Sequence, residues 1–194
     1  MIEYEHIKIK KEKRGNNQGF TIIELLIVII VIGILSAISL PSFLNQANKA
    51  RQTEAKTYIG SMNRAQQAAY LEQGGFVTDL DQLALGIPSE TTTYIYRISV
   101  GSAAGSSVVN RAIPSDGSFS NTPNPQAGAS AYIGGVKSGR ASGTGESTTL
   151  SIICEALTPP IVSGEDGTTA EPTNLDSSLA GRPSCDPSTY RSIE

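Results

Sequence analysis

The sequence predicts an α+β protein in which a long N-terminal helix packs on an antiparallel β-sheet. The first observation behind this prediction is a continuous helical pattern over residues 20–73, apolar on every side at its start and amphipathic afterwards. The second is the change after Gly74-Gly75, where short segments rich in β-branched and aromatic residues alternate with Gly, Ser and Pro. Residues 74–194 are numerous enough for one modest hydrophobic core.

The first 19 residues form a charged leader that differs from an ordinary secretory signal. Five Lys or Arg residues and three Glu residues give it a net charge of +2. An ordinary signal has its apolar region before the cleavage site and loses it on cleavage, whereas here the apolar region follows Gly19. Because basic flanks stay in the cytoplasm, we expect a cytoplasmic N-terminus and an outward-facing remainder.

The apolar segment, residues 20–41, has the length of a membrane span. From Phe20 to Leu40 it contains 21 residues, or about 30 Å of helix, which matches a bilayer core. Its many β-branched residues would suggest a strand in water, but a spanning segment must satisfy its backbone internally, which favours a helix. Pro41 lacks an amide donor, so together with Gly33 it predicts a weak point in the helix, at least a bend.

A single carboxylate, Glu24, interrupts the apolar segment. A charge at the centre of a membrane helix costs about 2.5–3.5 kcal/mol on insertion scales, so the residue indicates a functional site with a partner. Its place near the helix start also allows a simpler explanation, because the positive end of the helix dipole favours a carboxylate.

The tetrapeptide Gly19-Phe20-Thr21-Ile22, followed by Glu24, resembles the processing site of type IV prepilins. The resemblance implies that a dedicated prepilin peptidase cuts after Gly19 and methylates the new amine of Phe20. It also implies that Glu24 pairs with this amine on a neighbouring subunit during assembly. The alternative is a plain type II signal anchor with an incidental Gly-Phe pair.

Residues 42–73 change to an amphipathic helical pattern, with apolar residues at three- and four-residue steps. The Gly74-Gly75 pair supplies a stop signal. Residues 49–56 and 59–67 are similar to the corresponding helix of cyanobacterial major pilins. Pilins of this family also have a Gly and a Pro at places matching Gly33 and Pro41, and that stretch loosens in assembled filaments. An ordinary alanine-rich helix would fit the composition equally well.

Residues 74–194 have the composition of a β-rich domain, which we call the head. The clearest strands are Tyr94–Val100 and Ser147–Cys154, and weaker candidates are Val108–Ile113 and Ala131–Val136. Eight of the ten prolines follow residue 113, which concentrates turns in the last third of the chain. A short apolar patch is expected to pin the connection between helix and sheet, and it consists of Leu80, Leu83, Leu85 and Ile87.

The two cysteines, Cys154 and Cys185, both lie in the part expected outside the cytoplasm. An even count in an oxidising compartment favours a disulfide, which would stabilise the fold by about 3–4 kcal/mol on a chain-entropy estimate. Type IV pilins commonly tie their C-terminal segment to the sheet in this way. Two unpaired thiols or a two-cysteine metal site are the alternatives, although the only histidine, His6, belongs to the leader.

Catalytic patterns are absent from the sequence after Gly19. It contains no histidine, which excludes Ser-His and Cys-His nucleophilic sites, so we expect no enzyme and no cofactor. The glycine-rich segment 139–145 lacks the Gly-Lys-Ser/Thr of a phosphate loop. Carboxylates at Asp79, Asp81 and the Glu165-Asp166 pair could bind calcium, but they lack EF-hand spacing, and we expect no metal.

These features are identified as those of a type IV pilin, a structural protein with the pilin fold. The resemblance implies a single-pass inner-membrane protein that polymerises as a homopolymer into an extracellular fibre for twitching motility, adhesion or DNA uptake. Its expected partners are other pilin subunits, prepilin peptidase and the assembly platform of the inner membrane. The chain carries −3 overall and therefore −5 without the leader, which argues against direct binding of nucleic acid. A pseudopilin of a type II secretion system and a non-assembling membrane-anchored binding protein are the alternatives.

Overall fold

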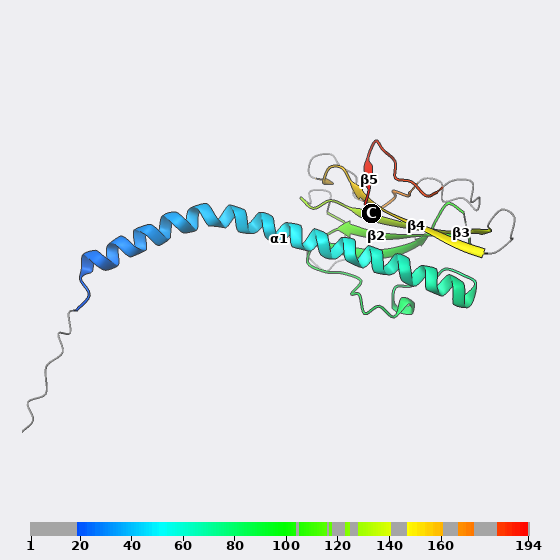
Figure 1. Ribbon diagram of the computed structural model, residues 1–194, viewed down its shortest axis with the longest axis horizontal. Coiled ribbons are helices and arrows are strands. Elements are labelled where there is room, and N and C mark those ends of the chain that lie inside the picture. The colour runs from blue at the N-terminus through cyan, green and yellow to red at the C-terminus, as the bar shows by residue number, and fades with distance from the viewer. Residues whose placement is uncertain are drawn as a thin grey trace, which may run out of the picture. The chain divides into compact units, whose positions relative to one another are not determined.

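The computed structural model in Figure 1 describes residues 19–103, 105–115, 117, 123–124, 128–140, 147–160, 167–172 and 182–193. The leader up to residue 18, most of the glycine-rich segment 139–145 and the Glu165-Asp166 pair lie outside the described residues. The chain divides into two compact units, residues 1–45 and 46–194. Helix α1 (Ile22–Gln73) has turns in both units.

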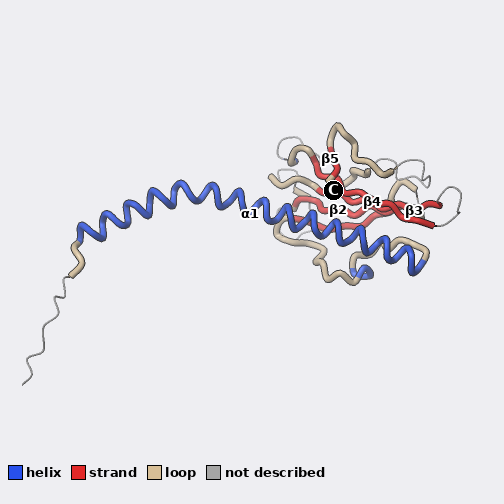
Figure 2. The backbone as a smooth tube through the Cα atoms, viewed as in Figure 1, coloured by secondary structure: helices blue, strands red, loops and turns tan. Residues whose placement is uncertain are grey.

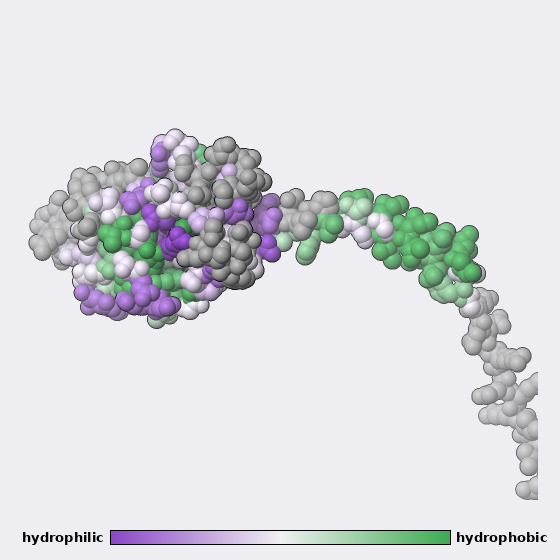
Figure 3. All heavy atoms as spheres, turned by 180° about the vertical axis from the view of Figure 1, so that it is seen from behind, coloured by the Kyte–Doolittle hydropathy of each residue, from purple (hydrophilic) through white to green (hydrophobic). Residues whose placement is uncertain are grey.

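The first unit contains the apolar turns of α1. Residues Ile22–Leu40 form a stretch long and apolar enough to cross a membrane, with a mean hydropathy of 2.9. None of the residues in this window is buried. Figure 3 shows that hydrophobic residues make up most of the surface of this stretch on the face in view. The helix is uninterrupted through Gly33 and Pro41, and the loosening expected there stays a prediction about the assembled filament.

Helix α1 ends where the sequence predicts, at the Gly74-Gly75 pair. Gly74 has a φ of +72° and its N–H donates to the carbonyl of Tyr70 at 2.9 Å, which is a common glycine end to a helix. The connection to the sheet contains the single turn η1 (Asp81–Leu83). Leu80, Leu83 and Ile87 pack on the core as expected, whereas Leu85 is exposed, so that part of the predicted patch is wrong.

Among the described residues, five strands form one antiparallel meander with the spatial order β1-β2-β3-β4-β5, and Figure 2 draws this sheet in red beside the blue helix. All four predicted strands are confirmed, and β3 extends further than predicted. The fifth strand was not predicted, because three residues carry too little alternation to be recognised. The strands are β1 (Tyr94–Val100), β2 (Ser107–Pro114), β3 (Tyr132–Arg140), β4 (Ser147–Ala156) and β5 (Tyr190–Ser192).

The second half of α1 lies along one face of this sheet (Figure 1). Ile59 and Met62 are fully buried there, and burial of each is worth about 1.5–3 kcal/mol. Tyr58 meets Tyr96 of β1 edge to face, with ring centroids 5.4 Å apart. The core on this face further includes Ala55, Ala69, Tyr94, Ala112 and Tyr132. The predicted packing of the amphipathic helix on an antiparallel sheet is therefore confirmed.

Helix α1 approaches the sheet closely at Gly134 in β3. A Cβ atom at this position would lie 2.7 Å from Cγ2 of Ile59 and would also overlap Oδ1 of Asn63. Real Cβ atoms essentially never show such distances, so the helix can only sit this close because residue 134 has no side chain.

The opposite face of the sheet carries a second cluster of buried side chains, covered by segments from the last third of the chain. Ala131, Ile133, Cys154, Ala156 and Tyr190 form this cluster. Gly167 lies against it, since a Cβ there would be 2.9 Å from Cβ of Ala131. The described head thus has three layers, namely helix, sheet and C-terminal segments.

Replacing Gly134 with alanine should destabilise the head by about 1–3 kcal/mol, the usual cost of overpacking a core. The physical reason is that the new methyl group must displace Ile59 and Asn63. Thermal unfolding of the full chain in detergent, followed by near-ultraviolet circular dichroism, measures the change. Gly75→Ala is the matched control, because a Cβ at Gly75 meets nothing within 4 Å. Equal melting temperatures for the two variants would contradict the close packing of the helix on β3 at Gly134.

Candidate assembly and processing site

The N-terminus of α1 is built by Thr21 and Glu24, which form a reciprocal capping box. Oε2 of Glu24 accepts hydrogen bonds from the backbone N–H and from the hydroxyl of Thr21, both at 2.9 Å. The N–H of Glu24 donates to the hydroxyl oxygen of Thr21 at 3.3 Å. Such a box satisfies backbone donors that the first turn of a helix leaves without partners.

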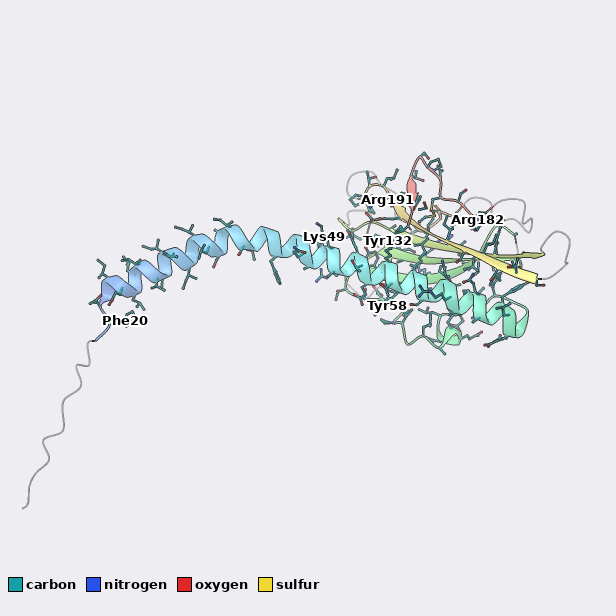
Figure 4. All side chains as sticks on the ribbon, viewed as in Figure 1. Phe20, Lys49, Tyr58, Tyr132, Arg182 and Arg191 are labelled. Atoms are coloured by element: carbon teal, nitrogen blue, oxygen red, sulfur yellow. A yellow bond between two sulfur atoms is a disulfide. The ribbon has the colours of Figure 1, made fainter. Side chains whose placement is uncertain are left out.

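Both Thr21 bonds end on the same oxygen of the Glu24 carboxylate. Within the described residues, the other oxygen, Oε1, accepts no hydrogen bond. The side chain is exposed, and Phe20 before it is 81% exposed and labelled in Figure 4. A Cβ on Gly19 would meet nothing within 4 Å. The predicted site residues Gly19, Phe20 and Glu24 are thus all accessible to another molecule.

Thr21 was not recognised as a partner of Glu24 from the sequence. The signal that identifies it is the spacing Thr21-x-x-Glu24 before an apolar run, which is the sequence form of a capping box. The structure therefore adds a local role for the carboxylate to the assembly role expected from the resemblance.

Two amides on the buried face of α1 bind the backbone of the head. Gln66 makes a pair of hydrogen bonds with Val77, donating to its carbonyl at 2.6 Å and accepting from its N–H at 2.9 Å. Asn63 donates to the carbonyl of Ile152 at 3.0 Å and accepts from the side chain of Asn110 at 2.9 Å. Because a buried amide without partners is costly, these bonds select one register of the helix on the sheet.

The covering segments on the opposite face are held by a disulfide and a buried arginine. Cys154 and Cys185 form the disulfide, with Cα atoms 5.6 Å apart. Arg111 donates to the hydroxyl of Ser99 and to the carbonyl of Ala170, and its guanidinium lies 3.7 Å from a carboxylate oxygen of Glu171. Burial lowers the pKa of Arg111, and the charge of Glu171 partly opposes that shift.

Tyrosines and one ion pair link the sheet to its last strand. The hydroxyl of Tyr132 donates to Glu155 at 3.0 Å, and the guanidinium of Arg191 donates to the same carboxylate at 2.8 Å (Figure 4). Burial raises the pKa of Tyr94 and Tyr96, and burial followed by the charge of Glu155 raises the pKa of Tyr132. These hydroxyls remain protonated at neutral pH. That of Tyr94 donates to the carbonyl of Ser130 at 3.0 Å, whereas that of Tyr96 is buried without a hydrogen-bond partner among the described residues and contributes to packing.

Among the described residues, no cluster of three or more His, Cys, Asp or Glu side chains could hold a metal ion. The carboxylate of Asp79 instead accepts a hydrogen bond from the N–H of Asp81 at 3.1 Å, which shapes the start of η1.

Two family models match the chain. One, described as type IV pilin-like G and H, matches residues 52–178, and the other, the prokaryotic N-terminal methylation motif, matches residues 14–40. The first covers the second part of α1 and strands β1 to β4 but ends before β5, and the second covers the capping box and the apolar turns of α1.

Several curated proteins are similar to the chain. The type IV major pilin protein PilA of Myxococcus xanthus is 36% identical over 96 residues, which are 50% of this chain and 42% of that protein. Prepilin peptidase-dependent protein D of Escherichia coli is 43% identical over 84 residues, 43% of this chain and 57% of that protein. The type IV wide pilus major component PilA4 of Thermus thermophilus is 32% identical over 89 residues, 45% of this chain and 68% of that protein. The chain thus spans about half the length of the first of these relatives.

Replacing both cysteines with serine should lower the stability of the head by about 3–4 kcal/mol, because the unfolded chain regains the freedom of the closed loop. Thermal unfolding with and without a reducing agent measures this effect. The reductant should lower the melting temperature of the unaltered chain and leave the Cys154→Ser/Cys185→Ser variant unchanged. Full alkylation of both cysteines before reduction would contradict the bridge.

Proposed function

We propose, from the premise that this chain belongs to the type IV pilin-like G and H family, that it is a structural subunit of a type IV pilus. The observation that carries the proposal is the continuity of α1, whose exposed apolar turns run without a break into the turns seated on the sheet. An apolar surface of this size is stable only in lipid or against other apolar helices. One segment therefore serves as a membrane anchor before assembly and as the polymerising helix afterwards.

The proposal divides the chain by task. Residues 1–19 are a leader that prepilin peptidase removes. Residues 20–41 form the membrane and polymerisation helix, and residues 42–73 form the part of the helix that carries the head. Residues 74–194 form the outward-facing head. The leader stays in the cytoplasm by its basic charge. After cleavage, the inner-membrane assembly platform would deliver the subunit into a homopolymeric extracellular fibre.

Glu24 supports this proposal through its free oxygen. Oε2 already serves the capping box, so Oε1 is open to the positive amine of Phe20 on a neighbouring subunit. An uncleaved subunit has a neutral amide between Gly19 and Phe20 and offers no such charge. The carboxylate would thus favour cleaved subunits and one axial register.

Immunogold labelling of sheared surface fibres tests the proposed function. Antibody raised against the head, residues 74–194, should decorate the fibres along their length. Labelling confined to the cell envelope, with no labelled fibre under any growth condition, would refute it.

Cleavage predicts a mature protein that begins with N-methylated Phe20. A bulky residue in place of Gly19 should block the cut, because the peptidase must approach the backbone closely there. Intact-mass measurement of the membrane pool checks both statements. A Gly19→Val protein of mature mass, or an unaltered protein that keeps residues 1–19, would sink the idea.

Two substitutions separate the local role of Glu24 from its role in assembly. Glu24→Gln keeps a side-chain oxygen for the capping box but removes the charge, and it should reduce fibre yield about tenfold or more while the membrane pool stays normal. Thr21→Ala removes the box, at a cost of about 0.5–2 kcal/mol in the first turn, yet keeps the charge and should retain most fibres. Immunoblots of sheared and cell-bound fractions measure both. The reverse pattern would mean that the carboxylate acts only as a cap.

A further inference from the structure

Three hollows of the head converge on one stretch of β4. Their volumes are about 370, 550 and 240 Å³, and Ile152 lines all three. Strand β5 is short and lies beside the C-terminal end of β4 (Figure 1). Its residues pair with Cys154–Ala156 and not with the earlier residues of β4. The hollows therefore open where the sheet edge passes from β5 to β4.

At this edge, part of the backbone of β4 has no hydrogen-bond partner among the described residues. Ile193 N–H donates to the carbonyl of Ile153, and Leu157 N–H to that of Thr189, both at 2.9 Å. Antiparallel strands direct alternate residues to opposite sides, so the odd-numbered residues of β4 face the β5 side. Thr149 and Ser151 come next in this series, and in the described part of the chain neither has a backbone partner on that side.

The rim of these hollows is positively charged. Arg182 lines the first hollow and Arg64 the third, and both are exposed; Figure 4 labels Arg182. Among the described residues that line the three hollows there is no Asp or Glu. The edge suits an extended segment from a negatively charged surface.

The opposite edge of the same sheet has complementary properties. Tyr96 N–H donates to the carbonyl of Ser89 at 2.8 Å, so the even-numbered residues of β1 face outward. Segment 89–91 covers only the start of this edge. Ile98 and Val100 follow without a backbone partner in the residues described, and Val100 is 49% exposed. The adjoining segment 74–93 carries Asp79, Asp81 and Glu90 and contains no Lys or Arg.

The two free edges also lie on the same cross-strand row. Val100 pairs with Val108, Val108 with Val136, and Val136 with Ser151. Three antiparallel steps separate β1 from β4, so β4 of one copy would meet β1 of an equally oriented second copy in the antiparallel sense. Strand addition at exposed edges is a recurring mode of recognition.

We propose that the edge of β4 at Thr149–Ser151 pairs with β1 of a second copy of this chain at Ile98–Val100. The inference rests on the proposed function, which brings copies side by side. The contact joins different surfaces of the two copies, and such a contact repeats into an open filament when its rotation does not close a ring. Arg64 and Arg182 meet the acidic side of the neighbour, and Ser151 lies opposite its Val100.

A pair of engineered cysteines tests the register of this contact. Directly opposite residues of antiparallel strands have Cα atoms about 4.5–5.5 Å apart, which is within reach of a disulfide. The full chain with Ser151→Cys and Val100→Cys should give a ladder of covalent multimers from sheared fibres on non-reducing gels. Each single variant should give none. A matched control, Gln82→Cys with Ser188→Cys, uses two exposed positions outside the proposed strand pair and should also give none.

Proline at Ser151 provides the second test. Its N–H faces outward and makes no backbone hydrogen bond in the described residues, and proline is tolerated in edge strands at such positions. Ser151→Pro should leave the melting temperature of the head unchanged and lower fibre yield several-fold.

Five outcomes are distinguishable. A ladder restricted to the Ser151/Val100 pair, with loss of fibres in Ser151→Pro, supports the contact. A ladder from Ser151→Cys alone would mean that like edges meet, and a ladder in the control would mean random collision; either result overturns the inference. Normal fibres from Ser151→Pro without any ladder overturn it but leave the proposed function intact. Absence of fibres from the unaltered chain would refute the proposed function itself.

Discussion

The rest of the head depends on the close packing of α1 against β3. With no side chain at Gly134, Ile59 and Asn63 come down onto the strand. At this distance the Asn63 amide spans from Ile152 in β4 to Asn110 in β2. Apolar burial and hydrogen bonding are therefore formed in the same register. A methyl group at residue 134 would push the helix away from the strand. The head would then lose apolar contact area and also leave buried amides without hydrogen-bond partners, which together cost more free energy than either loss alone.

The helix and most of the sheet could be predicted because their patterns leave few alternatives. An all-round apolar stretch the length of a bilayer core, followed by an amphipathic stripe and a Gly-Gly stop, predicts α1 to within about two residues at each end. Alternation with β-branched residues identifies β1 and β4. Asn63 and Gln66 show the limit of this reasoning, since helical periodicity assigns them to the buried face but says nothing of Val77 or Ile152 as their partners.

The covered face of the sheet was beyond prediction for a related reason. Arg111 stands in a strand pattern where a charged residue indicates a solvated face. In the structure its guanidinium is buried against Ala170 and Glu171, about sixty positions further along the chain. Such a contact depends on how the C-terminal segments return over the sheet, and only the pair Cys154 and Cys185 hinted at that return. The guanidinium supplies a hydrogen bond to the Ala170 carbonyl and a positive charge beside Glu171, and charged hydrogen bonds of this kind are stronger than neutral ones.

The capping role of Glu24 and its proposed assembly role are compatible in one side chain. The energetic difficulty of a carboxylate in an apolar helix has two parts, namely its unsatisfied lone pairs and its net charge. Thr21 addresses the first part, because its N–H and hydroxyl occupy Oε2. Neutral donors leave the second part, so a bundle of apolar helices still favours any arrangement that brings a positive group to Oε1. The capping box thus orients the carboxylate in the single subunit and lowers the entropy that must be lost when a cationic partner binds. Under the proposed function, the local role therefore prepares the carboxylate for the assembly role.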